Sequence, residues 1–201
     1  MENINFETLE ILNLGSNNIE DINILQKVNF KKLKELDLSV NQISDISIFT
    51  KVNFKNLEIL DLSYNKLSDI SILKNIKFKE LKKLILSNNK ISDINVLEKV
   101  KFNKLEILDL EENNITDINI LERVKFNNLK ELNIFFNEIL DINVLERIKL
   151  KKLKKIYLSN DNIKTIKRIK KKQKFKFIIR KSLYLPTLSG FEQSGFSVED
   201  E

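Results

Sequence analysis

The sequence predicts an α/β protein: a right-handed, horseshoe-shaped solenoid with a parallel β-sheet on its concave face and short helices on its convex face. Two observations support this fold. Each repeating unit follows the pattern LxxLxLxxNxIxDIxxLxxVxFxx, as in residues 57–80. A fixed period of this length is typical of stacked coils, because one coil cannot bury its apolar face without neighbours. Seven leucines mark the starts of the units at an unbroken spacing of 24 residues: Leu9, Leu33, Leu57, Leu81, Leu105, Leu129 and Leu153.

The start of each unit predicts a short strand. Leu60 and Leu62 flank Asp61, so both leucines point to one face and the aspartate to the other. In parallel strands, residues of neighbouring units then form columns about 4.8 Å apart. The second position of the unit alternates in charge and predicts cross-strand ion pairs that neutralise this column: Glu10, Lys34, Glu58, Lys82, Glu106, Lys130 and Lys154.

An asparagine recurs in the turn after each predicted strand. Its side-chain amide can both donate to and accept from the backbone of adjacent turns, so we expect a buried asparagine ladder. The seventh unit carries Asp161 instead, which can only accept hydrogen bonds when ionised. The ladder residues are Asn17, Asn41, Asn65, Asn89, Asn113 and Asn137.

The second half of the unit predicts a short helix and a phenylalanine column. Aspartates before the helix are suited to accept the free N–H groups of its first turn; these are Asp21, Asp45, Asp69, Asp93, Asp117 and Asp141. Phenylalanines recur behind the strands, with Leu150 in the seventh unit, and we expect them to stack as a spine: Phe6, Phe30, Phe54, Phe78, Phe102 and Phe126.

The LxxLxLxxNxI signature of residues 9–166 resembles the leucine-rich repeat family. The Asp-Ile pair after the turn is similar to that of bacterial internalins and of the leucine-rich regulatory subunit of protein phosphatase 1. This resemblance implies a non-enzymatic scaffold or adaptor that holds a protein partner on its concave face.

Composition argues against most catalytic chemistry. The chain has no cysteine and no histidine, which excludes Ser-His-Asp and Cys-His nucleophiles, conventional zinc sites and disulfides. Asp37 and Asp61 are expected on adjacent strands about 5 Å apart, the carboxylate separation of retaining glycosidases. Any repeat with Asp in that column produces the same pair, so we expect no enzyme activity, no cofactor and no metal.

The expected partner site combines outward strand positions with the turn that follows them. Exposed aromatic side chains beside carboxylates are typical of protein interfaces. We expect both Phe135 and Phe136 to be exposed; the alternative is that one ring folds inward. The candidate partner-binding residues are Asp37, Asp61, Tyr64, Ile85, Asp109, Glu111, Phe135, Phe136 and Tyr157.

Charge is distributed unevenly along the chain. Residues 1–163 hold 25 basic and 25 acidic side chains, whereas residues 164–182 hold ten basic and no acidic ones. This indicates that the basicity belongs to one segment and not to a surface. Residues 164–181 therefore offer an alternative function, nucleic-acid or anionic-surface binding, through Lys167, Arg168, Lys170, Lys171 and Lys172. The balanced repeats make nucleic acid the less favoured partner.

The ends of the chain complete the expected organisation. Residues 1–8 are expected to be a partial preceding repeat, 9–166 seven repeats, 167–182 a basic C-terminal cap and 183–201 a flexible acidic tail. Leu9, Leu12 and Leu14 would leave an uncapped edge open to self-association. The sequence shows no signal peptide and no transmembrane segment, and we expect a cytoplasmic location, with the nucleus as the alternative.

Overall fold

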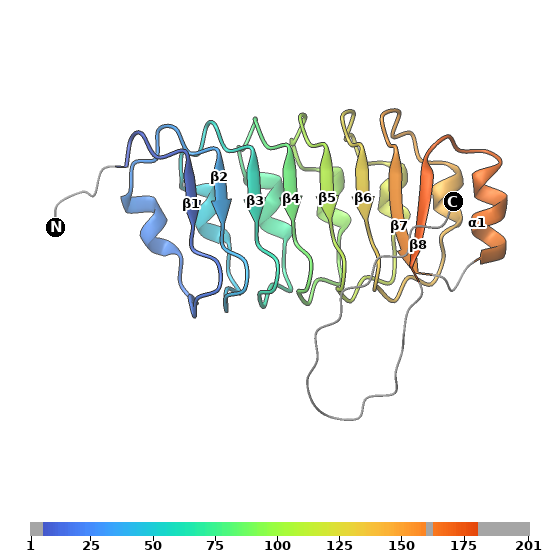
Figure 1. Cartoon of the computed structure of the whole chain (residues 1–201), viewed down its shortest axis with the longest axis horizontal. Coiled ribbons are helices and arrows are strands. Elements are labelled where there is room, and N and C mark those ends of the chain that lie inside the picture. Colours follow the sequence, from blue (N-terminus) through green and yellow to red (C-terminus); the bar gives the residue numbers. More distant parts are fainter. Residues whose placement is uncertain (1–5, 160–162, 181–201) are drawn as a thin grey trace, which may run out of the picture.

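The computed structural model describes residues 6–159 and 163–180, and its strands form one parallel sheet in chain order (Figure 1). Leu36 pairs with Leu60 and Leu60 with Leu84, so the 24-residue period sets the register. The strands are β1 (Ile11–Asn13), β2 (Glu35–Asp37), β3 (Ile59–Asp61), β4 (Lys83–Ile85), β5 (Ile107–Asp109), β6 (Glu131–Asn133), β7 (Lys155–Ser159) and β8 (Lys176–Arg180).

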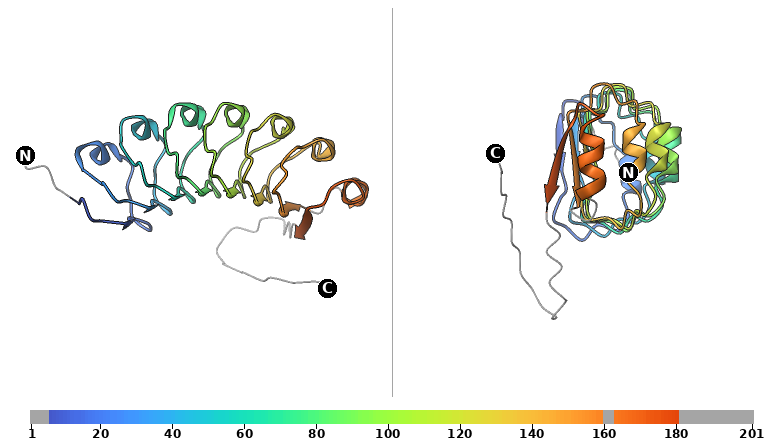
Figure 2. Two further views of the ribbon diagram at one scale, coloured as in Figure 1. Left: turned by 90° about the horizontal axis from the view of Figure 1, so that it is seen from above. Right: turned by 90° about the vertical axis from the view of Figure 1, so that its right-hand side faces the viewer.

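Short helices return the chain from the end of one strand to the start of the next. Figure 2 shows these helices along the outer side of the curve and the strands along its inner side. The predicted α/β solenoid is confirmed. The helices within the described residues are the 3-10 helices η1 (Asn23–Lys27), η2 (Ser47–Thr50), η3 (Ser71–Asn75), η4 (Asn95–Glu98), η5 (Asn119–Glu122) and η6 (Asn143–Glu146), and the α-helix α1 (Ile163–Lys170).

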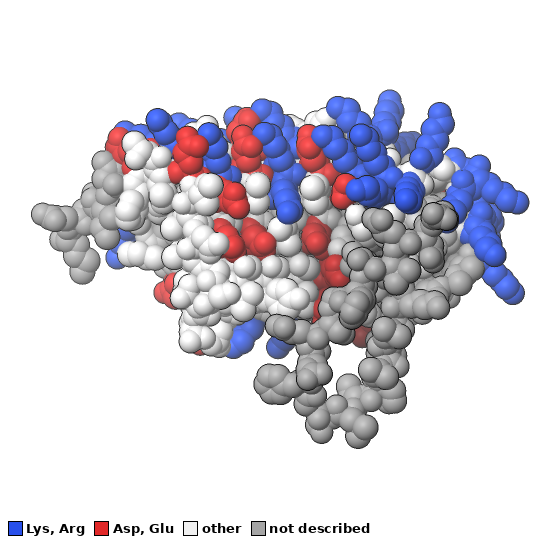
Figure 3. All heavy atoms as spheres, in the orientation of Figure 1, with Lys and Arg blue, Asp and Glu red and all other residues white. Residues whose placement is uncertain are grey.

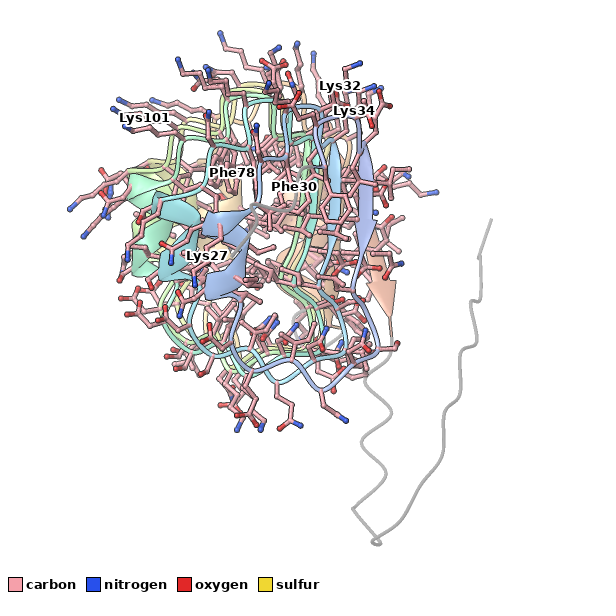
Figure 4. The ribbon with its side chains drawn as sticks, turned by 90° about the vertical axis from the view of Figure 1, so that its left-hand side faces the viewer. Lys27, Phe30, Lys32, Lys34, Phe78 and Lys101 are labelled. Carbon is pink, nitrogen blue, oxygen red and sulfur yellow. The ribbon has the colours of Figure 1, made fainter. Side chains whose placement is uncertain are left out.

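The core lies between the sheet and the helices. The phenylalanine column is buried from Phe30 onward, and ring centroids of Phe30 and Phe54 lie 5.7 Å apart. Phe30 and Phe78 both lie between the two layers in the view along the solenoid (Figure 4). Phe6, at the open end, remains 44% exposed. The stacked coils thus bury apolar surface that a single coil would leave in water.

The column of asparagines joins adjacent turns. Asn89 donates to the carbonyl oxygens of Leu62 and Leu86, and its Oδ1 accepts the N–H of Leu67. The expectation of a buried side chain is wrong for Asn17, which is exposed and whose side-chain amide donates to Leu14 and Gly15 within its own turn; Asn137 is only partly buried. The reason for the exposure of Asn17 is its place in the first described turn, where the described residues include no earlier coil to cover it. Asp161 lies outside the described residues.

The aspartates before the helices bond to the backbone at the helix start. The Oδ1 of Asp69 accepts the N–H of Ser71 at 2.7 Å, and this bond is the main cause that lowers the pKa of Asp69. The same bond recurs in the other turns, with Asp21, Asp45, Asp93, Asp117 and Asp141. Each carboxylate thereby satisfies one of the N–H groups that a helix start leaves open.

The last strand of the described sheet, β8, is not predicted by the repeat pattern. Lys155 of β7 pairs with Lys176 of β8, a shift of 21 residues. The expected boundary between repeats and basic cap, at Ile166, falls inside α1. Apolar side chains of this segment are buried against the seventh coil: Ile166, Ile169, Phe175 and Phe177. Most of the expected partial repeat, 1–8, and nearly all of the expected tail, 183–201, lie outside the described residues.

Candidate functional site

Two rows of side chains face outward from the concave sheet. The fifth position of the unit, anticipated from sequence, carries partly exposed side chains: Asp37, Asp61, Ile85, Asp109, Asn133 and Tyr157. Sequence reasoning missed the third position, although the alternation within LxxLxL was the signal for it. This second row mixes isoleucines with charges: Ile11, Glu35, Ile59, Lys83, Ile107, Glu131 and Lys155.

The aspartates of the fifth position have a structural task. Oδ1 of Asp37, Asp61 and Asp109 each accepts a backbone N–H two residues later, at 2.9 Å. Such a bond closes the turn after the strand, which explains why Asp or Asn recurs there. Asp37 and Asp61 are paired across β2 and β3 as expected, but their contacts are those of turn-forming residues.

The turn after each strand holds a residue in the left-handed conformation. For a side chain other than glycine this conformation costs about 1 to 2 kcal/mol, and asparagine tolerates it best. Val40, Tyr64 and Phe136 nevertheless occupy it, with 47%, 56% and 38% of their surface exposed. Neither the backbone nor the core favours a bulky apolar residue at these places. The full row is Ser16, Val40, Tyr64, Asn88, Glu112 and Phe136, with φ between 48° and 57°.

The expectation that both phenylalanines of the sixth coil are exposed is wrong for Phe135. This side chain is only 3% exposed, although it lies outside the buried core that includes its neighbour Ile134. Its ring centroid lies 4.1 Å from that of Phe136. Phe135 therefore packs against the Phe136 ring, and Phe136, which is 38% exposed, is the more accessible of the two.

Carboxylates gather beside this row. We call Asp61, Asp109, Glu111 and Glu112 the acidic cluster; Figure 3 shows acidic atoms over the middle of the sheet. Burial raises the pKa of Asp109, and the charges of Glu111 and Asp61 raise it further. Burial, followed by the charge of Glu111, also raises the pKa of Glu112. The cluster is thus a place of negative potential where a cation would be stabilised.

Neighbouring polar side chains position the ends of the cluster. Asn133 Nδ2 donates to Glu111 Oε2 at 2.6 Å. On the next strand, Glu131 accepts Lys155 Nζ at 2.9 Å and the Tyr157 hydroxyl at 3.5 Å. Tyr157 is therefore held by hydrogen bonding at one side of the surface.

The alternating column forms the ion pairs expected of it. Glu10 with Lys34, Glu58 with Lys82 and Glu106 with Lys130 lie 2.6 to 2.8 Å apart. These pairs lie near the starts of the strands, away from the acidic cluster, and keep that column nearly neutral.

The C-terminal basic segment is partly engaged in the fold. Glu146 of η6 accepts Arg168 Nε at 2.5 Å and Lys172 Nζ at 2.6 Å, and Arg168 also bonds to Asn143. Arg168 and Lys172 thus connect the C-terminal segment to η6 by ion pairs. The remaining members of the predicted set are exposed: Lys167, Lys170 and Lys171.

Charges that balance along the chain are separated in space, so the expectation that basicity is confined to one segment is wrong. The loops that lead into the strands form one flank, at the top of Figure 3, which we call the basic flank. These loops, residues 26–34, 50–58, 74–82, 98–106, 122–130 and 146–154, hold 21 basic and 6 acidic residues. The opposite turns, residues 13–21, 37–45, 61–69, 85–93, 109–117 and 133–141, hold 13 acidic and 2 basic residues.

The described residues contain no group of three or more His, Cys, Asp or Glu side chains that could hold a metal ion. None of their helices is both long and apolar enough to cross a bilayer.

Several solved structures have a similar architecture. The internalin InlF of Listeria monocytogenes superposes with a TM-score of 0.64 at 28% identity, covering 85% of this chain and 47% of that one. Internalin C2 of the same organism gives 0.58 at 28% identity, covering 76% and 72%. A chain of the LRIM1/APL1C complex gives 0.63 at 20% identity, covering 87% and 35%, and shows the fold alone. The chain thus spans about half the length of InlF.

Sequence comparison assigns the family. No curated protein matches the sequence. The family described as Leucine Rich repeats (2 copies) matches residues 7–51, 31–75 and 79–123, which is more than half of the chain. The protein belongs to the leucine-rich repeat family.

Proposed function

We propose that this protein is a non-enzymatic scaffold or adaptor that binds a protein partner on its concave face. Leucine-rich repeats indicate protein–protein interaction. The observation that supports the concave face is the row of exposed Val40, Tyr64 and Phe136 in left-handed backbone conformations. Strain of this kind persists where the side chain serves a function. An interface would bury these side chains and recover their apolar area.

The acidic cluster defines the chemistry of the partner. Burial is the main cause of the raised pKa of Asp109 and Glu112, and neighbouring carboxylates add to it. A lysine or arginine placed next to these groups would stabilise their charged forms. Apolar side chains beside that cation would contact Tyr64 and Phe136. The proposed partner segment is therefore basic and carries exposed apolar residues, and its charge would orient it on the surface.

The experiment compares capture of partners from a lysate of the source cells by wild type and by Tyr64→Ala/Phe136→Ala. We expect at least a tenfold loss of one or more captured proteins, because exposed aromatic side chains contribute most at such interfaces. The matched control is Ile24→Ala/Leu140→Ala, which truncates two exposed apolar side chains outside this row. Equal capture by wild type and the aromatic variant would rule out this surface.

The basic segment 164–181 remains the alternative site, supported by the exposed Lys167, Lys170 and Lys171. Binding through these lysines would fall steeply with added salt, whereas a concave contact with a mainly apolar centre would respond weakly. A salt titration of the captured complex separates the two.

The first strand offers a surface for self-association. β1 pairs with β2 on one side, and Ile11 is 59% exposed. Leu9, Leu12 and Leu14 pack only partly against the core. Light scattering over a range of concentrations would reveal a dimer formed at this edge, and Ile11→Lys would abolish it. A wild type that stays monomeric throughout would exclude this association.

A further inference from the structure

The basic flank carries more positive charge than the fold can neutralise. All six acidic residues in its loops already form ion pairs: Glu58, Glu80, Glu98, Glu106, Glu122 and Glu146. Within the described part of the chain, 14 of the 21 basic residues of these loops have no ion pair. The excess charge therefore faces solvent, where another anion can reach it.

A column of lysines repeats the same charge from coil to coil. Lys77, Lys101, Lys125 and Lys149 lie 24 residues apart, are exposed, and form no ion pair with any described residue. Neighbouring coils of the solenoid bring like charges together here, whereas the Glu10 to Lys130 column alternates in sign. Like charges in adjacent coils repel and lower stability. The column thus opposes folding unless something outside the chain compensates.

Lysine abundance alone does not explain this arrangement. A general bias toward lysine would place it at exposed positions on both flanks. The turns of the opposite flank instead carry Asn, Ser and Asp at such positions, with Lys66 and Lys90 as their two basic residues. The positive charge is therefore specific to one side of the solenoid.

The basic flank is shaped as a level strip. The loops that form it end at a common height along the solenoid (Figure 1). In the view along the axis, Lys32 and Lys34 lie at its sheet side and Lys101 at its convex side (Figure 4). A level strip brings many lysines to a plane at once, whereas a nucleic-acid duplex, being a cylinder, would touch it along one line.

The side chains of the basic flank also favour a lipid surface over nucleic acid. Its cations are lysines, except for Arg123 and Arg147, and both arginines are already paired with glutamates. The six loops that form the basic flank expose no large apolar side chain on which a base could stack. Single-strand binding depends on such stacking, and phosphate recognition usually favours arginine.

We propose that the basic flank binds the surface of an anionic lipid bilayer. Each lysine held near such a surface adds to the attraction, and the strip needs no inserted helix. With this flank on the membrane, the sheet stands across the bilayer plane and the concave face stays open to a protein partner.

Vesicle co-sedimentation tests the proposal with the full chain. Vesicles of phosphatidylcholine alone are compared with vesicles that contain about 30% phosphatidylserine. We expect binding only to the anionic vesicles and a steep loss with salt. Lys101→Glu/Lys125→Glu should reduce the partition coefficient by more than about thirtyfold, because losing the attraction of two lysines accounts for about thirtyfold and each glutamate also repels the surface.

The control is matched in charge and spacing. Lys66→Glu/Lys90→Glu changes the net charge equally, at two exposed residues also 24 positions apart, but on the opposite flank. It should bind like wild type. Circular dichroism confirms that each variant is folded, and the Tyr64→Ala/Phe136→Ala variant should keep full vesicle binding, which separates this site from the concave one.

Four results would overturn the proposal. The first is that wild type does not bind anionic vesicles, and the second is that Lys66→Glu/Lys90→Glu loses as much binding as Lys101→Glu/Lys125→Glu. Lys167→Glu/Lys171→Glu alone could abolish binding while the flank variant retains it, which would assign the site to the C-terminal segment. Duplex DNA or RNA displacing the protein from vesicles at equal charge concentration would identify nucleic acid as the preferred ligand.

Discussion

Asn89 Nδ2 lies 2.9 Å from the carbonyl oxygen of Leu62, which precedes it by 27 residues. The same nitrogen also donates to Leu86 within its own coil, so one side chain ties two coils together. Because Asn89 is buried, water cannot replace these bonds when the side chain is removed.

Asn89→Ala should lower the free energy of unfolding by about 3 kcal/mol, since it leaves several buried backbone groups without a partner. Asn17→Ala, in the same column but exposed, should lower it by less than about 1 kcal/mol. Urea denaturation followed by circular dichroism measures both. Equal losses at the two positions would show that the bonds to the neighbouring coil contribute nothing.

Val40→Asn should stabilise the protein by about 1 kcal/mol, because asparagine tolerates the left-handed backbone better than a β-branched side chain. The reverse exchange at the equivalent place, Asn88→Val, should destabilise it by a similar amount. Thermal unfolding provides the measurement. A destabilised Val40→Asn variant would mean that Val40 contributes to packing and is not retained for binding.

Asp109→Asn should be more stable than wild type at pH 7. The folded-state pKa of Asp109 is raised above its ordinary 3.8, so its charge opposes folding at neutral pH and this penalty disappears as the pH falls through that raised pKa. Asparagine can keep the turn bond, as Asn133 does with the N–H of Phe135 in the next coil. The difference in the free energy of unfolding between Asp109→Asn and wild type should therefore become smaller as the pH is lowered.

Asp69→Asn is the control for Asp109→Asn, because the pKa of Asp69 is shifted in the opposite direction and its stability should change with pH in the opposite sense. The N–H of Ser71 lowers the folded-state pKa of Asp69, so its charge favours folding above the ordinary pKa and that contribution is lost in acid. This variant should be less stable than wild type at pH 7. Unfolding curves from pH 7 to pH 3 follow both variants, and equal pH profiles for the two would contradict the assigned causes.

Glu146→Gln should loosen the C-terminal end of the solenoid without affecting its centre. The bond from Lys172, followed by that from Arg168, lowers the pKa of Glu146, which is only 15% exposed. Hydrogen exchange should accelerate in α1 and β8, while the amides of β3 and β4 keep their protection. Uniform acceleration across all strands would instead indicate that the end and the centre unfold together.

The repeat architecture follows from sequence with few ambiguities. The spacing of the leucines specifies the coil length, the strand register and most of the core, because residues 24 apart must stack when every coil is the same length. The candidate surface stays a prediction; the structure places Asp61 and Asp109 in the sheet and Tyr64 and Phe136 in the turns that follow the strands. The exposure of Phe135 was predicted wrongly, because the alternation along the strand gives the face of a side chain but not what packs against it.

The distribution of surface charge and the burial of individual residues depend on how the coils stack. Residues 1–163 contain equal numbers of basic and acidic side chains. In the folded chain, however, most of the lysines lie on the basic flank and most of the aspartates in the turns of the opposite flank. Likewise, β8 joins the sheet after 21 residues, and Asn17 remains exposed because the described residues include no earlier coil beside it. The coil period can be read residue by residue, whereas burial and surface potential depend on which coils are neighbours, and only the folded chain establishes that.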